Sequence, residues 1–189
     1  MNIHSFYCPP VHLLTARHGL AKSGMISTWI VPSTLAQQHP TLLALLSKRS
    51  YTAELAMASG QLLLHWLAMG QEHLLPRFAL SSGRAEDKFA GLPDVTEGPC
   101  GLPFIPGTCG HALGTLLSSL DTGDRWAILL GLSEITLRAG AQPLLEGPAL
   151  AALPVATQQT LSLRYLADQQ RDEDLVMKEP YIAQPGGSS

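Results

Sequence analysis

Charged residues are scarce in this chain, and their scarcity excludes several kinds of partner. They make up only 14% of the 189 residues, and the formal net charge is −3. Without an excess of lysine and arginine there is no general basic field, which argues against nucleic acid as a partner. Apolar residues account for 46% of the chain. That share is high for a soluble monomer, so we expect apolar surface to be buried between subunits.

Cysteine and long apolar runs are also lacking. Cys8, Cys100 and Cys109 are odd in number and stand in no metal-ligand spacing, so the sequence predicts neither a disulfide framework nor a zinc site. We expect free thiols in a reducing cytosol. No apolar run reaches the roughly 18 residues of a membrane helix, and residues 1–10 lack the basic and apolar regions of a signal peptide. These absences predict a cytoplasmic protein with no membrane partner.

Several familiar catalytic motifs are missing as well. The chain has no Gly-x-Ser-x-Gly elbow, no glycine fingerprint of a dinucleotide fold and no phosphate loop ending in Gly-Lys-Ser/Thr. Its seven histidines include no His-x-x-x-His pair on one helix face. The sequence therefore gives little support to a hydrolase, a Rossmann-type enzyme or a metal site.

Short apolar and β-branched runs dominate what is present, and they predict a mainly β protein with peripheral helices. Such a pattern is typical of a closed or nearly closed barrel. A Gly- and Pro-rich stretch at 91–110 predicts a surface connection. We expect one domain over 1–189, with a barrel core at about 10–150 and a C-terminal extension at 151–189. The predicted strands lie within 1–20 and at 25–35, 41–46, 61–68, 111–120 and 125–137, and the predicted helices at 52–58, 71–78 and 161–175.

The segment 47–52 carries the strongest local hint of a ligand site. An apolar strand runs into Lys48, Arg49 and several hydroxyl side chains, and a helix-like segment follows. Backbone N–H groups point outward at a helix N-terminus, where the helix dipole favours an anion, and cationic side chains add charge-assisted hydrogen bonds. The pattern therefore indicates a phosphate site. The alternative is a solvated turn in which Thr52 caps the helix.

Two further residues allow both a ligand and a structural interpretation. Trp29 lies between Thr28 and an apolar pair, ahead of Ser33 and Thr34. Polar groups beside an aromatic ring suit a flat heterocycle with hydrogen-bonding edges, although a core or interface role fits equally well. Lys88 beside Phe89 reads, by itself, as a solvated lysine next to a buried ring.

Short motifs occur in a fixed order along the chain. They are residues 24–31 (GMISTWIV), 33–35 (STL) with His39-Pro40, 47–52 (SKRSYT), Gly60, 71–72 (QE), 77–79 (RFA), 87–89 (DKF), 123–125 (GDR) and Gly131. In this order and spacing they resemble the flavin reductase family, whose fold is the FMN-binding split β-barrel. The resemblance covers roughly residues 20–145.

The resemblance implies an FMN site with NAD(P)H as co-substrate, in a homodimer that holds the flavin near the subunit interface. The first group of implied contacts runs along the isoalloxazine ring, the second binds the ribityl chain and phosphate, and the third closes the pocket, with its lysine near the phosphate. The contacts along the ring are Thr28, Trp29, Ile30, Val31, Ser33, Thr34 and Leu35. The contacts to the ribityl chain and phosphate are Ser47, Lys48, Arg49, Ser50 and Thr52, and the residues that close the pocket are Phe78, Ala79 and Lys88.

Three positions depart from the family pattern. Ser23 stands where the family often has Asn, and His39-Pro40 stands where it often has two prolines. Arg125 replaces a histidine that commonly lies near the nicotinamide. Arginine cannot act as a neutral imidazole, although it can pair with a dinucleotide phosphate.

Three hypotheses for the function follow from the resemblance and its departures. The first is an oxidoreductase that passes hydride from NAD(P)H to FMN, with the reduced flavin serving an acceptor protein or a monooxygenase. The flavin itself would accept the hydride, so we assign no catalytic residue and name Arg125 only as a contact for the nicotinamide cofactor. The second is an FMN-binding electron carrier without NAD(P)H activity. The third is a split barrel that acts as an interaction module without the cofactor.

Overall fold

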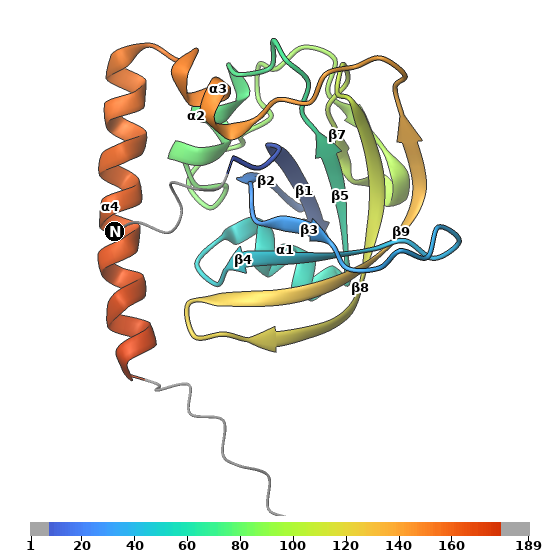
Figure 1. The fold of residues 1–189 in the computed structure, drawn as a ribbon, viewed down its shortest axis with the longest axis horizontal. Coiled ribbons are helices and arrows are strands. Elements are labelled where there is room, and N and C mark those ends of the chain that lie inside the picture. The colour runs from blue at the N-terminus through green and yellow to red at the C-terminus, as the bar shows by residue number, and fades with distance from the viewer. Residues whose placement is uncertain (1–7, 179–189) are drawn as a thin grey trace, which may run out of the picture.

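The computed structural model describes residues 8–178, which form a curled antiparallel sheet flanked by helices (Figure 1). The strand order in this seven-stranded sheet is β2-β1-β5-β8-β9-β4-β3, and a separate pair joins β6 to β7. The strands are β1 (His12–His18), β2 (Ala21–Ser27), β3 (Ile30–Pro32), β4 (Thr41–Ser47), β5 (Gln61–Trp66), β6 (Thr96–Glu97), β7 (Pro103–Phe104), β8 (Gly110–Asp121) and β9 (Arg125–Leu137). The predicted mainly β fold with peripheral helices is confirmed.

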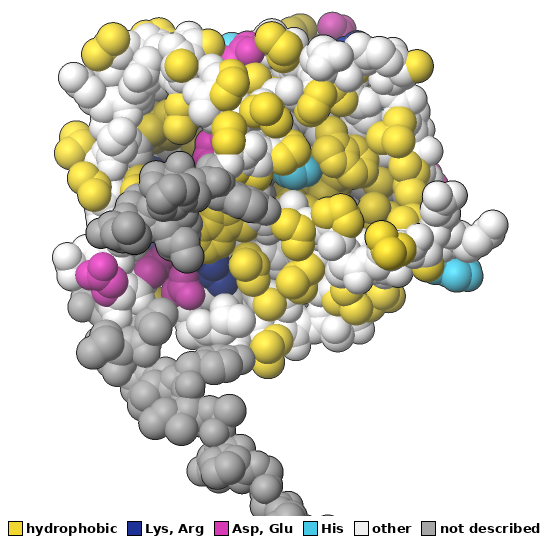
Figure 2. All heavy atoms as spheres, in the orientation of Figure 1, with side chains coloured by type: hydrophobic (Ala, Val, Ile, Leu, Met, Phe, Trp, Pro, Cys, Tyr) yellow, Lys and Arg dark blue, Asp and Glu magenta, His cyan; other side chains and the backbone are white. Residues whose placement is uncertain are grey.

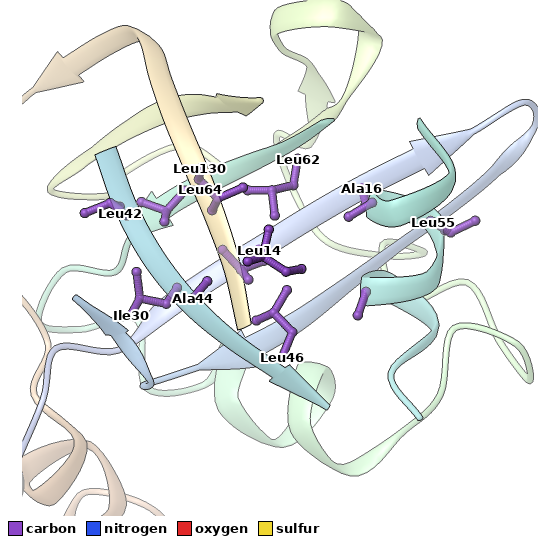
Figure 3. Packing of buried hydrophobic residues seen from close by; sticks show 13 residues of the cluster. Leu14, Ala16, Ile30, Leu42, Ala44, Leu46, Leu55, Leu62, Leu64 and Leu130 are labelled. Carbon is purple, nitrogen blue, oxygen red and sulfur yellow. The ribbon is translucent and has the colours of Figure 1, made fainter. Parts of the chain in front are cut away.

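The largest core cluster fills the inside of the curled sheet (Figure 3). Burial alternates along β4, where Leu42, Ala44 and Leu46 face the core, because successive side chains of a strand point to opposite faces. On β1, neighbouring Leu13 and Leu14 are both fully buried. They can both be buried because a second cluster covers the outer face of β1 with α2 (Leu74–Leu80) and α3 (Glu146–Ala151).

Buried His65 connects the sheet to the loop after β7 through both of its ring nitrogens. His65 Nδ1 lies 3.1 Å from the carbonyl oxygen of Leu13, and the N–H of Ile105 donates to His65 Nε2 at 3.2 Å. One ring nitrogen donates and the other accepts, so the imidazole is neutral. Burial, which outweighs the hydrogen bond to Leu13, lowers the pKa of His65 to about 4.

The helix after β4, α1 (Tyr51–Ser59), begins and ends at clear caps. Ser50 is the N-cap, and its hydroxyl accepts from the N–H of Ala53 at 3.3 Å. Gly60 ends the helix at φ +74°, a left-handed conformation that glycine adopts without strain. The predicted end at Gly60 is confirmed, whereas the alternative of Thr52 as the N-cap is wrong. Thr52 is buried and donates to Ser23 Oγ on β2 at 2.9 Å.

Several predicted elements differ from the observed ones. The strand expected at 25–35 is two strands, β2 and β3, and Pro32 ends β3 at the sheet edge. The helix expected at 71–78 starts at Leu74; Pro76 is tolerated because the N–H groups of a first turn need no helical partner. The connection at 91–110 is not wholly on the surface, since it includes β6 and β7 and buries Leu102 and Ile105.

The last element is a long helix, α4 (Val155–Lys178), which stands alongside the barrel (Figure 1). It begins and ends beyond the predicted helix at 161–175. It packs mainly on α2, and none of its side chains that the structure describes is buried.

Candidate functional site

The register between β4 and β9 brings the two ends of the site together. Ser47, the last residue of β4, pairs with Arg125, the first residue of β9. The next residue on the β4 side, Lys48, donates its N–H to the carbonyl oxygen of Asp124 at 3.1 Å. The loop that leads into α1 therefore lies directly beside the hairpin turn at residues 121–124.

A polar cavity of about 270 Å³ opens at this place. Hydroxyls line it from the end of β4, the start of α1 and the loop after α2, and three guanidinium groups and one ammonium group reach it. Its donors are Ser23, Ser47, Ser50, Tyr51, Thr52, Ser81, Ser82, Lys88, Arg49, Arg125 and Arg164. Such a concentration of donors can hold an anion.

Lys88 closes the floor of this cavity and is not solvated. Its side chain is 6% exposed, and its ammonium group donates to the carbonyl oxygens of Gly24 and Phe78 at 3.0 Å each. Burial, with the positive charge of Arg164 as a smaller cause, lowers the pKa of Lys88 to about 8. The expectation of a solvated lysine is wrong.

A larger cavity of about 810 Å³ adjoins the polar one, between the sheet and α4. Trp29 and Thr28 line it from the β2–β3 connection, Glu146 from α3, and Leu161 and Tyr165 from α4. The two cavities are neighbours along one path, because four residues line both of them: Ile26, Ala79, Arg164 and Asp168. The guanidinium carbon of Arg125 lies 4.2 Å from the centre of the Trp29 ring, and this contact joins the two halves.

The two cavities bring together many of the residues that the sequence predicted. The polar cavity collects the predicted phosphate segment except its lysine, together with the predicted closing residues and Arg125, and the larger one collects Thr28, Trp29 and again Ala79. The predicted residues that line the polar cavity are Ser47, Arg49, Ser50, Thr52, Phe78, Ala79, Lys88 and Arg125.

The other predicted residues line neither cavity. Ile30 is buried in the core, Val31 is exposed, and Ser33 pairs with Thr41 at 2.7 Å between their hydroxyls. Thr34 accepts from the N–H of Ala36, and Leu35 is fully exposed. Lys48 points away, forming an ion pair with Asp121 and lying 4.9 Å from the centre of the Trp126 ring.

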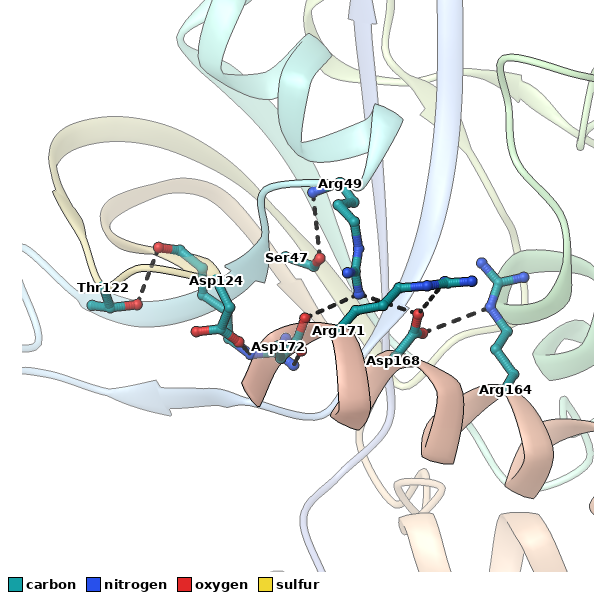
Figure 4. A network of polar contacts seen from close by, with 9 residues as sticks. Ser47, Arg49, Thr122, Asp124, Arg164, Asp168, Arg171 and Asp172 are labelled. Carbon is teal, nitrogen blue, oxygen red and sulfur yellow. Dashed lines mark hydrogen bonds and ion pairs between the residues drawn. The ribbon is translucent and has the colours of Figure 1, made fainter. Parts of the chain in front are cut away.

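Residues from α4 complete the polar cavity, and the sequence analysis missed them. Arg49 Nη2 lies 3.2 Å from Asp168 Oδ1 and 3.0 Å from Asp172 Oδ1, and Arg125 Nη2 lies 3.4 Å from Asp172 Oδ2 (Figure 4). Figure 2 shows acidic side chains with a basic one beside α4, next to a broad field of hydrophobic side chains. The available signal was the spacing of Arg164, Asp168 and Asp172, four residues apart on a predicted helix.

The electrostatics of Asp172 differ from those of an exposed ion pair. Burial raises the pKa of its carboxyl group and outweighs the opposite effects of Arg49 and Arg125. Asp124, which forms an ion pair with Arg125 at 3.1 Å, raises the pKa of Asp172 further. The carboxylate thus sits between two cations and one anion, in surroundings that do not favour its charge strongly.

The comparisons with known proteins decide the family. Residues 4–147 match the model of the flavin reductase like domain. The chain belongs to this family. As a flavin reductase-like protein it is 32% identical over 113 residues to the reductase subunit of a flavin-dependent monooxygenase from Rhodococcus jostii, a match that spans 60% of this chain and 56% of that relative.

Solved structures of flavin reductase-like proteins share the fold. Nitrilotriacetate monooxygenase component B from Mycobacterium thermoresistibile is 27% identical with a TM-score of 0.64, covering 74% of this chain and 75% of that one. The NADH:FAD oxidoreductase of Streptomyces globisporus is 21% identical with a TM-score of 0.67, covering 74% and 81%, and shows the likeness of fold alone. The resemblance found in the sequence is confirmed, and so is the split-barrel type of fold.

Two further observations concern residues 8–178 alone. No group of His, Cys, Asp and Glu side chains there could hold a metal ion. No helix in the same range is both long and apolar enough to cross a membrane.

Proposed function

We propose that this flavin reductase-like chain binds FMN and passes hydride to it from NAD(P)H. The observation that carries the proposal is the pair of adjoining cavities, one rich in cationic and hydroxyl donors and the other lined by Trp29 and apolar side chains. A flavin mononucleotide has the same two-part chemistry, with a doubly charged phosphate at one end and a flat ring system at the other.

The phosphate end would use groups that the barrel itself supplies. Arg49 and Ser50 follow β4, Ser50 caps α1, and Arg125 pairs with Ser47 in the sheet. Guanidinium groups recognise phosphate oxygens in a bidentate manner, and a helix N-terminus adds a favourable dipole. The barrel donors therefore fit a phosphate. The carboxylates of Asp168 and Asp172 on α4 do not fit a phosphate, because they already form ion pairs with the same guanidinium groups.

The ring end would lie against Trp29 and Thr28 in the larger cavity. Val11, Ile26, Leu75, Leu161 and other apolar side chains there would shield the ring, and polar groups of the lining, such as the Thr28 hydroxyl, would face its polar edge. Bound there, the flavin supplies the hydride chemistry, while the protein supplies stacking, orientation and a phosphate anchor. Lys88 keeps β2 and α2 together beneath the site through Gly24 and Phe78.

The monooxygenase components among the similar proteins support a partner of that kind. We propose that reduced flavin passes from this chain to an oxygenase or another acceptor protein. A homodimer is supported by the exposed apolar side chains of Leu117 and Leu120 on β8 and of Ile135 and Leu137 on β9. Light scattering after size exclusion should give twice the monomer mass. The free, exposed thiols of Cys8 and Cys100 fit a cytoplasmic location.

Arg125 favours a second candidate function, an FMN-binding electron carrier that does not react with NAD(P)H. Its guanidinium group faces the polar cavity and contacts Asp124 and the Trp29 ring, so a bound flavin phosphate would occupy it and leave no free contact for a dinucleotide. Two measurements separate the candidates. Titration of the purified protein with FMN should perturb the flavin spectrum, and its failure to do so would remove both candidates and leave a cofactor-free interaction module.

Stopped-flow mixing of the FMN complex with NADH and, separately, NADPH then tests for hydride transfer. We expect the flavin absorbance to bleach within seconds under anaerobic conditions. A flavin that stays oxidised with both nucleotides would contradict the reductase and support the carrier. Riboflavin serves as the control ligand, because it has the ring but lacks the phosphate.

A further inference from the structure

The C-terminal helix carries carboxylates into the polar cavity, where the barrel gathers cations that could hold an anion. Asp168 and Asp172 lie one helical turn apart on α4 and therefore on the same face. Both form ion pairs with Arg49, and Asp172 also pairs with Arg125 (Figure 4). The family match ends at residue 147, so these acidic residues lie outside the part of the chain that defines the family.

A phosphate and these carboxylates cannot share the guanidinium groups. A phosphate monoester carries a charge of about −1.5 to −2 at neutral pH. If it bound Arg49 while α4 kept its place, it would stand within a few ångströms of two carboxylates, and like charges at such distances repel strongly in a partly buried site. One anion must therefore leave when the other binds.

The helix is held weakly enough to be the one that leaves. None of its described side chains is buried, and it packs mainly on the short helix α2. The side chain of Arg49 is 37% exposed and that of Asp168 38% exposed. An ion pair at such exposure contributes little to stability. Asp172 and Arg125 are less exposed, at 18% and 24%, but burial of the Asp172 carboxylate opposes what its ion pairs contribute. Segments with few buried contacts open at low free energy.

We infer that Asp168 and Asp172 compete internally with the flavin phosphate for Arg49 and Arg125, and that the part of α4 that carries them moves away when a phosphorylated flavin binds. Leu161 and Tyr165, nearer the start of α4, continue to line the larger cavity. This inference rests on the proposed function. The apparent affinity for FMN is then the intrinsic affinity multiplied by the fraction of molecules in which α4 is withdrawn. Riboflavin has no phosphate and does not need the withdrawal, so the two carboxylates lower the preference of the site for FMN over riboflavin.

The test is the affinity of the full chain for FMN and for riboflavin, measured by fluorescence titration. The D168N/D172N variant removes both charges and keeps the side-chain shape. We expect it to bind FMN about tenfold more tightly, equivalent to about 1.4 kcal/mol at 25 °C, and riboflavin within about twofold of the parent. E173Q is the matched control, because Glu173 is an exposed residue of the same helix that lines neither cavity. It should change neither affinity.

Hydrogen exchange of α4 gives a second readout that needs no enzyme activity. FMN should speed exchange of the amides at 164–172 in the parent protein, and riboflavin should leave it unchanged. The inference is overturned if the parent binds FMN but the D168N/D172N variant binds it no more tightly, if both ligands gain equally, or if FMN slows exchange in α4. Absence of binding of either flavin by both the parent and the variant would instead overturn the proposed function and this inference with it.

Discussion

Arg49 and Asp172 form an ion pair of 3.0 Å that joins the loop after β4 to the C-terminal helix. The same carboxylate reaches Arg125 at the start of β9, so one acidic side chain bridges two cations at the same end of the β4–β9 pair. The arrangement makes the electrostatic state of the candidate site depend on where α4 lies. The structure also separates the two cations of the predicted phosphate segment, because Arg49 faces the cavity and its neighbour Lys48 does not.

That division predicts unequal effects of two neighbouring substitutions on flavin binding. R49A should weaken FMN binding by about tenfold or more, because a charge-assisted hydrogen bond contributes roughly 1.5–3 kcal/mol. Riboflavin binding should change by less than about twofold, since that ligand has no phosphate. K48A is the control: its ammonium group contacts Asp121 and Trp126, so both affinities should stay close to those of the parent. Equal losses for FMN and riboflavin in R49A would contradict a phosphate contact.

The position of the flavin ring can be tested through the three tryptophans. Trp29 lines the larger cavity, whereas Trp66 and Trp126 lie against the main core cluster and line neither cavity. We therefore expect bound FMN to quench the emission of Trp29 most strongly. W29F should remove most of the FMN-dependent quenching, and W126F should leave most of it. The proposed ring position is wrong if the two variants quench alike.

Local patterns were sufficient to predict β4, α1 and the β8–β9 hairpin, because each is encoded within a few neighbouring residues. A short apolar run predicts β4, Gly60 ends α1, and residues 121–124 form the turn. The role of Thr52 could not be read in the same way. Whether a hydroxyl caps its own helix or donates to another strand depends on tertiary packing, and here Ser23 on β2 accepts its hydrogen bond.

The candidate site divides along the same physical line. The segment at 47–52 was recognisable because strand, cations and helix start follow one another in the chain. The part played by Asp168 and Asp172 was not, because their partners are distant in sequence and an acidic helix face is normally solvated. Lys88 looked exposed for the same reason: the carbonyl oxygens that hold it come from β2 and α2.

Gly24 gives a prediction about the floor of the site. A Cβ atom at this position would stand 2.7 Å from the ring of Phe78, a buried residue of α2 that packs against β2. G24A should therefore lower the free energy of unfolding by about 1–3 kcal/mol, as overpacking in a core does. Chemical denaturation of the parent and the variant measures the difference.

The control for that substitution is G147A. Gly147 lies in α3, and the nearest atom to its Cβ would be the sulfur of exposed Cys8 at 3.3 Å, which can move. Alanine there should change stability less than G24A does: it favours a helix more than glycine, while the following Pro148 disfavours the helical conformation for a residue that carries a Cβ atom. A loss of stability in G147A as large as in G24A would point to the added methyl group in general and not to Phe78.

Acid should destabilise the fold through two buried histidines. Burial lowers the pKa of both His12 and His65 from 6.5 to about 4, against the weaker opposing effects of their hydrogen bonds to Ser27 and Leu13. As the pH falls from 6.5, the unfolded chain takes up protons before the folded one does, so the folded state loses relative stability. Their contribution is complete above pH 6.5 and is lost progressively down to about pH 4.

The expected slope is about 1.4 kcal/mol per pH unit for each histidine between these limits, measured as the free energy of unfolding in urea at successive pH values. H65Q should reduce the slope by about that amount, because glutamine retains a donor and an acceptor but does not titrate. H39Q is the control, since His39 is exposed and its loss should leave the slope unchanged. A parent protein whose stability stays constant from pH 6.5 to 5 would show that neither imidazole is held neutral by the fold.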